Sequence, residues 1–190
     1  SNLLQLTSAP SGIDSQLAVI SGGGTKIAFE STGNLTGQNA DGRFEIFAIN
    51  WDGTGLRQLT SSSSYDSYTP SITDDGQFVF FSFISTATTT REIWSIKSDG
   101  TGLTQLTSGF YPPVSLDHPV VAGGGSRIAF RGYDPATSDK LYVMTGTGTN
   151  IRQLEAAAVS SIERPEITRD GTRIVFASNA DPFGTNPDGG

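Results

Sequence analysis

The sequence predicts an all-β protein, a β-propeller of four-stranded antiparallel blades with about four blades represented and the ring incomplete in this chain. Two observations carry this prediction. The phrase Gln-Leu-Thr recurs with its leucine at residues 6, 59 and 106, and a partial copy contains Leu154. Between the copies, glycine turns alternate with short apolar runs, and no segment has the i, i+3, i+4 apolar spacing of a helix. A spacing of 47 to 53 residues fits one propeller blade.

Each repeat begins with the same two strand-like pieces joined by a tight turn. A segment containing proline comes first, at residues 68–73, 117–121 and 164–168. The turn follows, at Gly23-Gly24, Asp75-Gly76, Gly124-Gly125 and Asp170-Gly171. Such pairs accept the positive φ that primed hairpin turns require. A second strand is predicted directly after each turn, at residues 26–29, 78–81, 127–130 and 173–176.

The second half of each repeat supplies two more strands. Apolar residues alternate with period two at residues 45–49, 92–96 and 140–144, which predicts a third strand with two distinct faces. A glycine turn, at residues 52–55 and 99–102, joins this strand to the Gln-Leu-Thr strand. One blade cannot cover its own two apolar faces, so the blades must stack around an axis.

The chain is predicted to be a single propeller segment over residues 1–190. Its parts are a strand at 1–7, blades at 8–60, 61–107 and 108–154, and a partial blade at 155–190. Two hypotheses explain the incomplete ring: further blades of a six- or seven-bladed parent chain, or a remainder supplied by another copy. Open blade faces and strand edges favour association in either case.

The composition narrows the classes of partner. The 12 Lys and Arg against 19 Asp and Glu give a net charge of −7, which argues against binding of nucleic acid. The chain has no Cys, so it has no disulfide, thiolate nucleophile or Cys-ligated metal. The apolar runs are far shorter than a membrane span, so no membrane insertion is expected.

The order of these motifs resembles the repeat of TolB-like β-propellers. The matching phrases are Pro-x-Ser/Thr, Asp-Gly, Ile-Ala-Phe, Glu-Ile-Phe/Trp, Asp-Gly-Thr-Gly and Gln-Leu-Thr, and the likeness covers essentially the whole chain. The resemblance implies a non-catalytic binding or scaffold protein in the periplasm or the extracellular space. It also implies a protein or peptide partner that docks at the mouth of the central channel.

Two other functions stay open. The first is the gating propeller of a prolyl-oligopeptidase-like serine peptidase whose catalytic domain is absent. No Gly-x-Ser-x-Gly elbow occurs in residues 1–190 and the single histidine has no identifiable nucleophile, so no catalytic residue is assigned and this chain is not expected to be an enzyme. The second is a surface repeat protein stabilised by Ca²⁺.

Two similar loops contain the side chains that a Ca²⁺ site would need. Hard cations take several oxygen ligands from one small loop. The candidate ligands are Asn39, Asp41 and Glu45 in the first loop and Asp181, Asn186 and Asp188 in the second. The alternative is that these residues form Asx-turns, in which the side chains hydrogen-bond to their own backbone.

Aromatic residues before the proline segments are the predicted partner-binding residues. Tyr65 and Tyr68 precede one such segment, and Phe110 and Tyr111 precede the next. They could anchor a peptide or glycan at the channel rim, or pack between neighbouring blades. His118, the single histidine, is predicted near the channel as a hydrogen-bonding residue.

Overall fold

The computed structural model describes residues 3–84, 90–109, 115–133, 139–154 and 162–178, and these form β-strands without a helix. Blade 1 contains β1 (Ser15–Ile20), β2 (Lys26–Ser31), β3 (Glu45–Asn50) and β4 (Arg57–Gln58). Blade 2 contains β5 (Ser67–Ile72), β6 (Phe78–Ile84), β7 (Arg91–Lys97) and β8 (Thr104–Gln105). Blade 3 contains β9 (Ser115–Val121), β10 (Arg127–Tyr133), β11 (Lys140–Thr145) and β12 (Arg152–Gln153). Blade 4 contributes β13 (Glu166–Ile167) and β14 (Ile174–Val175).

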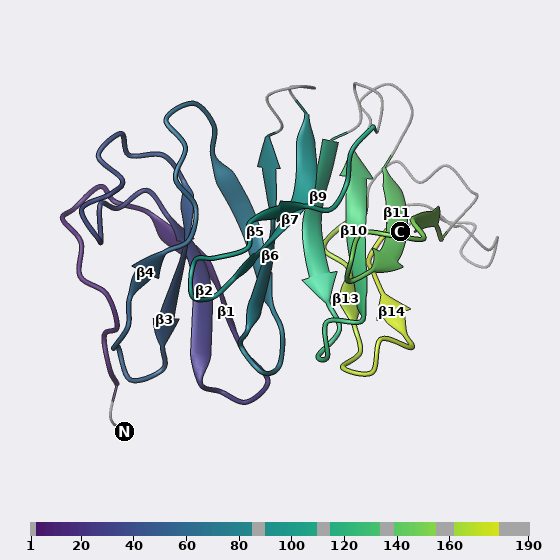
Figure 1. The fold of residues 1–190 in the computed structure, drawn as a ribbon, viewed down its shortest axis with the longest axis horizontal. Coiled ribbons are helices and arrows are strands. Elements are labelled where there is room, and N and C mark those ends of the chain that lie inside the picture. Colours follow the sequence, from purple (N-terminus) through teal and green to yellow (C-terminus); the bar gives the residue numbers. More distant parts are fainter. Residues whose placement is uncertain (1–2, 85–89, 110–114, 134–138, 155–161, 179–190) are drawn as a thin grey trace.

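The sheets lie side by side in chain order and do not close into a ring (Figure 1). Each sheet is antiparallel, with its strands in sequence order, which is the topology of a propeller blade. The predicted all-β propeller with an incomplete ring is therefore confirmed. None of the described segments is a helix that could span a membrane.

The outermost strands are shorter than the sequence pattern indicates. β4, β8 and β12 each end at the glutamine of the Gln-Leu-Thr phrase. Residues 3–14 form no strand, so the strand expected at residues 1–7 is absent from its described part. A strand there would need a hydrogen-bonded neighbour, and no described strand pairs with this segment. Leu6 instead packs against the cluster of Phe29, Phe47 and Ile49 on the open face of blade 1.

The turns between the first two strands differ in type from the primed turns expected. In blade 2 the Gly76 amide donates to Thr73 O at 2.9 Å, and the Thr73 amide donates to Phe78 O at 3.0 Å. Gly76 alone within this turn has positive φ, at 70°. A primed type I′ turn requires positive φ at both central residues. The connection is therefore a four-residue hairpin loop with one left-handed glycine.

The core lies in the seams between blades. Small and branched residues of one blade pack on large residues of the next, for example Ala28 and Ala48 against Phe81. The repeated leucine joins these seams, with Leu59 between blades 1 and 2 and Leu106 between blades 2 and 3. Burial of this leucine explains why the Gln-Leu-Thr phrase recurs.

Two buried glutamates join the third and fourth strands of their blades. The Thr107 hydroxyl donates to Glu92 Oε2 and accepts a hydrogen bond of 2.9 Å from the Ile93 amide. Thr60 makes the same pair of bonds with Glu45 and Ile46. The Gln-Leu-Thr threonine is therefore the partner of the glutamate in the first two residues of the third strand.

Replacing Glu92 with glutamine should change how stability depends on pH. Burial raises the pKa of Glu92 from its usual 4.5, against the opposing hydrogen bond from Thr107. A carboxyl group whose pKa is higher in the folded state than in the unfolded state stabilises the fold while it is protonated. This stabilisation is complete at pH values below the unfolded-state pKa and is lost as pH rises through the folded-state pKa. The free energy of unfolding of the variant should therefore improve relative to wild type as pH rises above about 4.5. Urea titrations at several pH values measure this, and parallel curves for the two proteins would contradict it.

A chain of backbone hydrogen bonds links the four blades at the turns after their innermost strands. The Gly23 amide donates to Asp74 O at 2.9 Å, Asp74 to Gly123 O at 2.8 Å, and Gly123 to Arg169 O at 2.9 Å. The Asp74 carboxylate lies between Gly22 and Gly123, where a Cβ on either glycine would collide with it, and it forms an ion pair with Arg169. These contacts hold the innermost strands in a fixed arrangement around the axis.

Candidate functional site

The innermost strands of three blades share an irregularity at the same position. The pairing register of β1, β5 and β9 with their neighbours shifts at a bulge. One residue in each bulge has a left-handed backbone although it is not glycine: Leu17 at φ 51°, Thr69 at 54° and His118 at 51°. Proline follows the left-handed residue in two of the three bulges, at Pro70 and Pro119. Proline has no amide hydrogen to donate, and a bulge tolerates this because its residues are not fully paired. The bulge is therefore a property of the repeat.

These bulges meet at one cavity. Leu17, Thr69 and His118 all line a cavity of about 180 Å³, together with Arg164 from the segment that leads into β13. The four side chains differ in size, polarity and charge, whereas the backbone of the three bulges is the same. A fixed backbone with variable side chains is suited to selective binding, because the side chains alone determine what fits.

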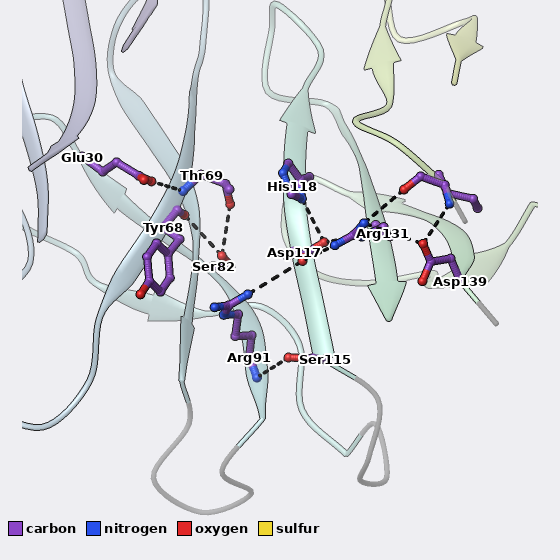
Figure 2. A network of polar contacts seen from close by, with 11 residues as sticks. Glu30, Tyr68, Thr69, Ser82, Arg91, Ser115, Asp117, His118, Arg131 and Asp139 are labelled. Carbon is purple, nitrogen blue, oxygen red and sulfur yellow. Dashed lines mark hydrogen bonds and ion pairs between the residues drawn. The ribbon is translucent and has the colours of Figure 1, made fainter. Parts of the chain in front are cut away.

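Polar contacts from the neighbouring strands hold the bulges in place. The Thr69 amide donates to Glu30 Oε2 at 2.6 Å, across the seam between blades 1 and 2 (Figure 2). The other carboxylate oxygen of Glu30 accepts a bond of 2.8 Å from Gln16. Thr69 and Ser82 share a hydroxyl–hydroxyl bond of 3.0 Å. The left-handed backbone is thus supported by contacts from two blades.

A buried aspartate next to His118 organises the polar network in blade 3 (Figure 2). Arg131 binds Asp117 in bidentate fashion, with both nitrogen–oxygen distances at 2.8 Å. His118 Nδ1 lies 3.0 Å from Asp117 Oδ1, and Arg91 Nη1 of blade 2 lies 3.9 Å from Oδ2. The Asp117 side chain is only 5% exposed. Arg131 also donates to Ile162 O at 3.2 Å, so the network reaches blade 4.

The network keeps Asp117 ionised. Burial by itself raises the pKa of Asp117, but hydrogen bonds and charge attraction from His118 and Arg131 outweigh it and hold the pKa below its usual 3.8. The bond to Asp117 likewise raises the pKa of Arg131. The Asp117 carboxylate thereby places a negative charge 3.0 Å from Nδ1 of the His118 ring, which lines the cavity.

The partner-binding residues expected from the sequence occupy different surroundings. His118 lines the axial cavity. Tyr68 lies in the seam between blades 1 and 2, 5.5 Å from the ring of Phe44 and 4.6 Å below the guanidinium of Arg91. Tyr65 is half-buried in the segment between β4 and β5. The prediction for Phe110 and Tyr111 falls outside the described residues.

The first predicted Ca²⁺ loop is held by its own hydrogen bonds. The Asn39 amide donates to Asn34 Oδ1 at 2.8 Å, and Asn39 Nδ2 donates to Arg43 O at 2.8 Å. Asp41 is exposed, and Glu45 accepts a bond of 2.6 Å from the Ser62 amide. Within the described ranges, no three acidic, histidine or cysteine side chains gather as metal ligands. The second loop, with Asp181, Asn186 and Asp188, lies outside the described residues, and Ca²⁺ binding stays a prediction.

Sequence reasoning missed the bulge residues Leu17 and Thr69 and the pair Asp117 and Arg131. One signal was available, since proline within an inner strand indicates a bulge. Asp117 and Arg131 face each other on the predicted hairpin of β9 and β10, but the bulge shifts the register that pairs them.

Comparison with solved structures identifies the fold. TolB of Agrobacterium tumefaciens is 20% identical with a TM-score of 0.66, and the match covers 86% of this chain and 53% of that chain. A chain of the nidogen/laminin complex is 12% identical with a TM-score of 0.60, over 82% and 53% of the two chains. A puromycin-hydrolysing peptidase of Mycobacterium tuberculosis is 14% identical with a TM-score of 0.61, over 87% and 26%.

The chain therefore has the fold of a TolB-like β-propeller and spans about a quarter to half of the length of these chains. No family model matches the sequence, and no curated protein matches it.

Proposed function

We propose that the chain is a non-catalytic binding module that takes a protein or peptide partner at the axial cavity, in the bacterial envelope or the extracellular space. The observation that carries the proposal is the convergence of Leu17, Thr69 and His118, on equivalent bulges, at one cavity. Because the repeat supplies the backbone, the side chains at these positions are free to differ and to select the partner.

The fold comparisons and the lining of the cavity both support this proposal. The fold is shared with TolB proteins and with a chain from a complex of two proteins, nidogen and laminin. The polar atoms beside the cavity also match a peptide, since Arg164 and His118 offer donors near the apolar side chain of Leu17.

The peptidase alternative rests on the puromycin-hydrolysing peptidase, of which the match covers about a quarter. In that alternative the propeller gates a hydrolase domain elsewhere in a longer chain. A Gly-x-Ser-x-Gly elbow in an extension of this sequence would favour it.

The proposal is tested by selecting binders from a random peptide library and measuring their affinity for two variants. Thr69→Arg places a long side chain at the cavity, and the selected peptides should bind it about tenfold more weakly or worse. Ser63→Arg adds the same charge at an exposed position that does not line the cavity, and should leave affinity unchanged. Selected peptides that bind Thr69→Arg as well as wild type would contradict the proposal.

A further inference from the structure

A groove lies in the seam between blade 2 and blade 3, and it shares no lining residue with the axial cavity. Its volume is about 410 Å³. Blade 2 supplies an apolar wall of Phe78, Phe80 and Leu106, and blade 3 supplies turn residues that include Gly125 and Thr147. Phe78 is 40% exposed, which is unusual for a phenylalanine in a blade seam.

Long basic side chains occupy the matching space between blades 1 and 2. A Cβ placed on Gly76 would lie 3.0 Å from Lys26 Cβ, and one placed on Gly100 would lie 3.3 Å from Arg57 Cδ. The aliphatic stem of Arg57 therefore packs on a turn of the following blade, and the base of the Lys26 side chain lies against the other turn.

The seam between blades 3 and 4 is filled in the same way. Arg127, which corresponds to Lys26, lies against Gly171, and its Nη1 donates to Gly171 O at 2.8 Å. This contact shows that the turn of a following blade can accept both the stem and the charged end of an arginine.

The seam between blades 2 and 3 lacks these side chains. Phe78 stands where Lys26 and Arg127 stand, since each is the first residue of the second strand. Thr104 stands where Arg57 stands, because Thr104 pairs with Ser95 as Arg57 pairs with Ala48. The groove is the space that a long basic side chain fills in the other two seams.

Two polar groups at the groove lack partners among the described residues. Ser95 is 8% exposed, and its hydroxyl forms no hydrogen bond within the described part of the chain. Asp75 Oδ1 accepts bonds from the Thr73 hydroxyl at 2.6 Å and from the Gln77 amide at 2.9 Å, while Oδ2 accepts none from a described residue. Because Ser95 and Asp75 both line the groove, their free oxygen atoms can each accept a hydrogen bond from a bound donor.

We propose that this groove binds a lysine or arginine side chain presented by a basic partner peptide. The stem would lie on Phe78 and Leu106, and the cation would approach Asp75 Oδ2 and the Ser95 hydroxyl. A cation over a phenylalanine ring adds to this attraction. Of the described lining residues Asp75 alone is charged, and the net charge of −7 favours a basic partner over an acidic one.

The test titrates the isotopically labelled chain with the peptide Ac-Gly-Arg-Gly-NH2 and follows the amide signals by NMR. Shifts are expected at Ser95, Gly125 and Thr147. The peptide with uncharged citrulline in place of arginine should bind the wild-type chain about two- to fivefold more weakly than the arginine peptide does. The arginine peptide should bind the Asp75→Asn variant more weakly than wild type by a similar factor. Thr104→Arg restores the long basic side chain of the first seam and should abolish the shifts.

Ser63→Arg is the control for charge, because it adds an arginine at an exposed position outside the groove. Any of three results would overturn the proposal. They are equal affinity for the arginine and citrulline peptides, amide shifts confined to the axial cavity, and undiminished binding of the arginine peptide to Thr104→Arg. Thr69→Arg should leave the arginine peptide bound, so this result is independent of the axial-cavity proposal.

Discussion

Replacing Asp117 with asparagine should lower the free energy of unfolding by about 3 kcal/mol, or the melting temperature by about 6–12 °C. The carboxylate is almost fully buried and receives two bonds of 2.8 Å from Arg131. Asparagine keeps the size of the side chain but removes the bidentate counter-charge of Arg131, whose remaining carboxylate partner is Asp139 at 3.6 Å. Removing one partner of a buried ion pair costs more than the pair contributes, because the remaining charge is desolvated without compensation.

The same substitution at exposed Asp41 is the control and should cost less than about 0.5 kcal/mol. Replacing both partners with apolar residues, Asp117→Leu with Arg131→Met, should recover part of the loss, since neither of the two is left without the other, whereas Asp139 loses its ion pair with Arg131. Urea titration measures all three proteins. If Asp117→Asn is no more damaging than Asp41→Asn, the Asp117 network does not hold the inner strands.

The pH dependence of the Asp117 effect has a definite sign. The folded-state pKa of Asp117 lies below its usual 3.8, so its contribution is present above that value and is lost as pH falls through the folded-state pKa. The difference in stability between wild type and Asp117→Asn should therefore be complete at neutral pH and shrink in strong acid.

Replacing Gly146 with alanine should destabilise the chain by about 3 kcal/mol, because the new methyl group meets backbone. A Cβ on Gly146 would lie 1.7 Å from Gly125 O and 2.9 Å from Gly125 C. Neither atom can move unless the paired turns of β9–β10 and β11–β12 separate. The Gly146 amide donates to Ser126 O at 3.0 Å, and this bond should be lost with the movement.

Gly124→Ala is the matched control, since a Cβ on Gly124 has no atom within 4 Å and the residue does not have positive φ. It should change the free energy of unfolding by less than about 0.5 kcal/mol. Thermal melts of the two variants give the comparison. Equal melting temperatures would mean that blade 3 tolerates a displaced turn.

The repeat made the blades predictable from the sequence. The period-two pattern of residues 45–49 placed β3 correctly, and the runs at 26–29 and 78–81 placed β2 and β6. These strands follow from local alternation and from burial on two faces, both of which single-sequence patterns encode. The fourth strands were predicted too long because their ends depend on pairing with a neighbour.

The contacts of the candidate site were less predictable. The bond between Thr69 and Glu30 crosses 39 residues of sequence, and the register that brings them together depends on how two blades pack. The repeat aligns Phe78 with Lys26, but the groove that this replacement leaves depends on how blade 3 packs on blade 2. His118 was placed near the axis by its position in the repeat, whereas its link to Asp117 and Arg131 required the fold.

The most direct test of the axial-cavity proposal is NMR mapping of a library-selected peptide on the isotopically labelled chain. The largest amide shifts should fall on Leu17, Thr69 and His118, on three different blades that meet at one cavity. Shifts confined to the outermost strands β4, β8 and β12, with these three amides unmoved, would contradict the proposal.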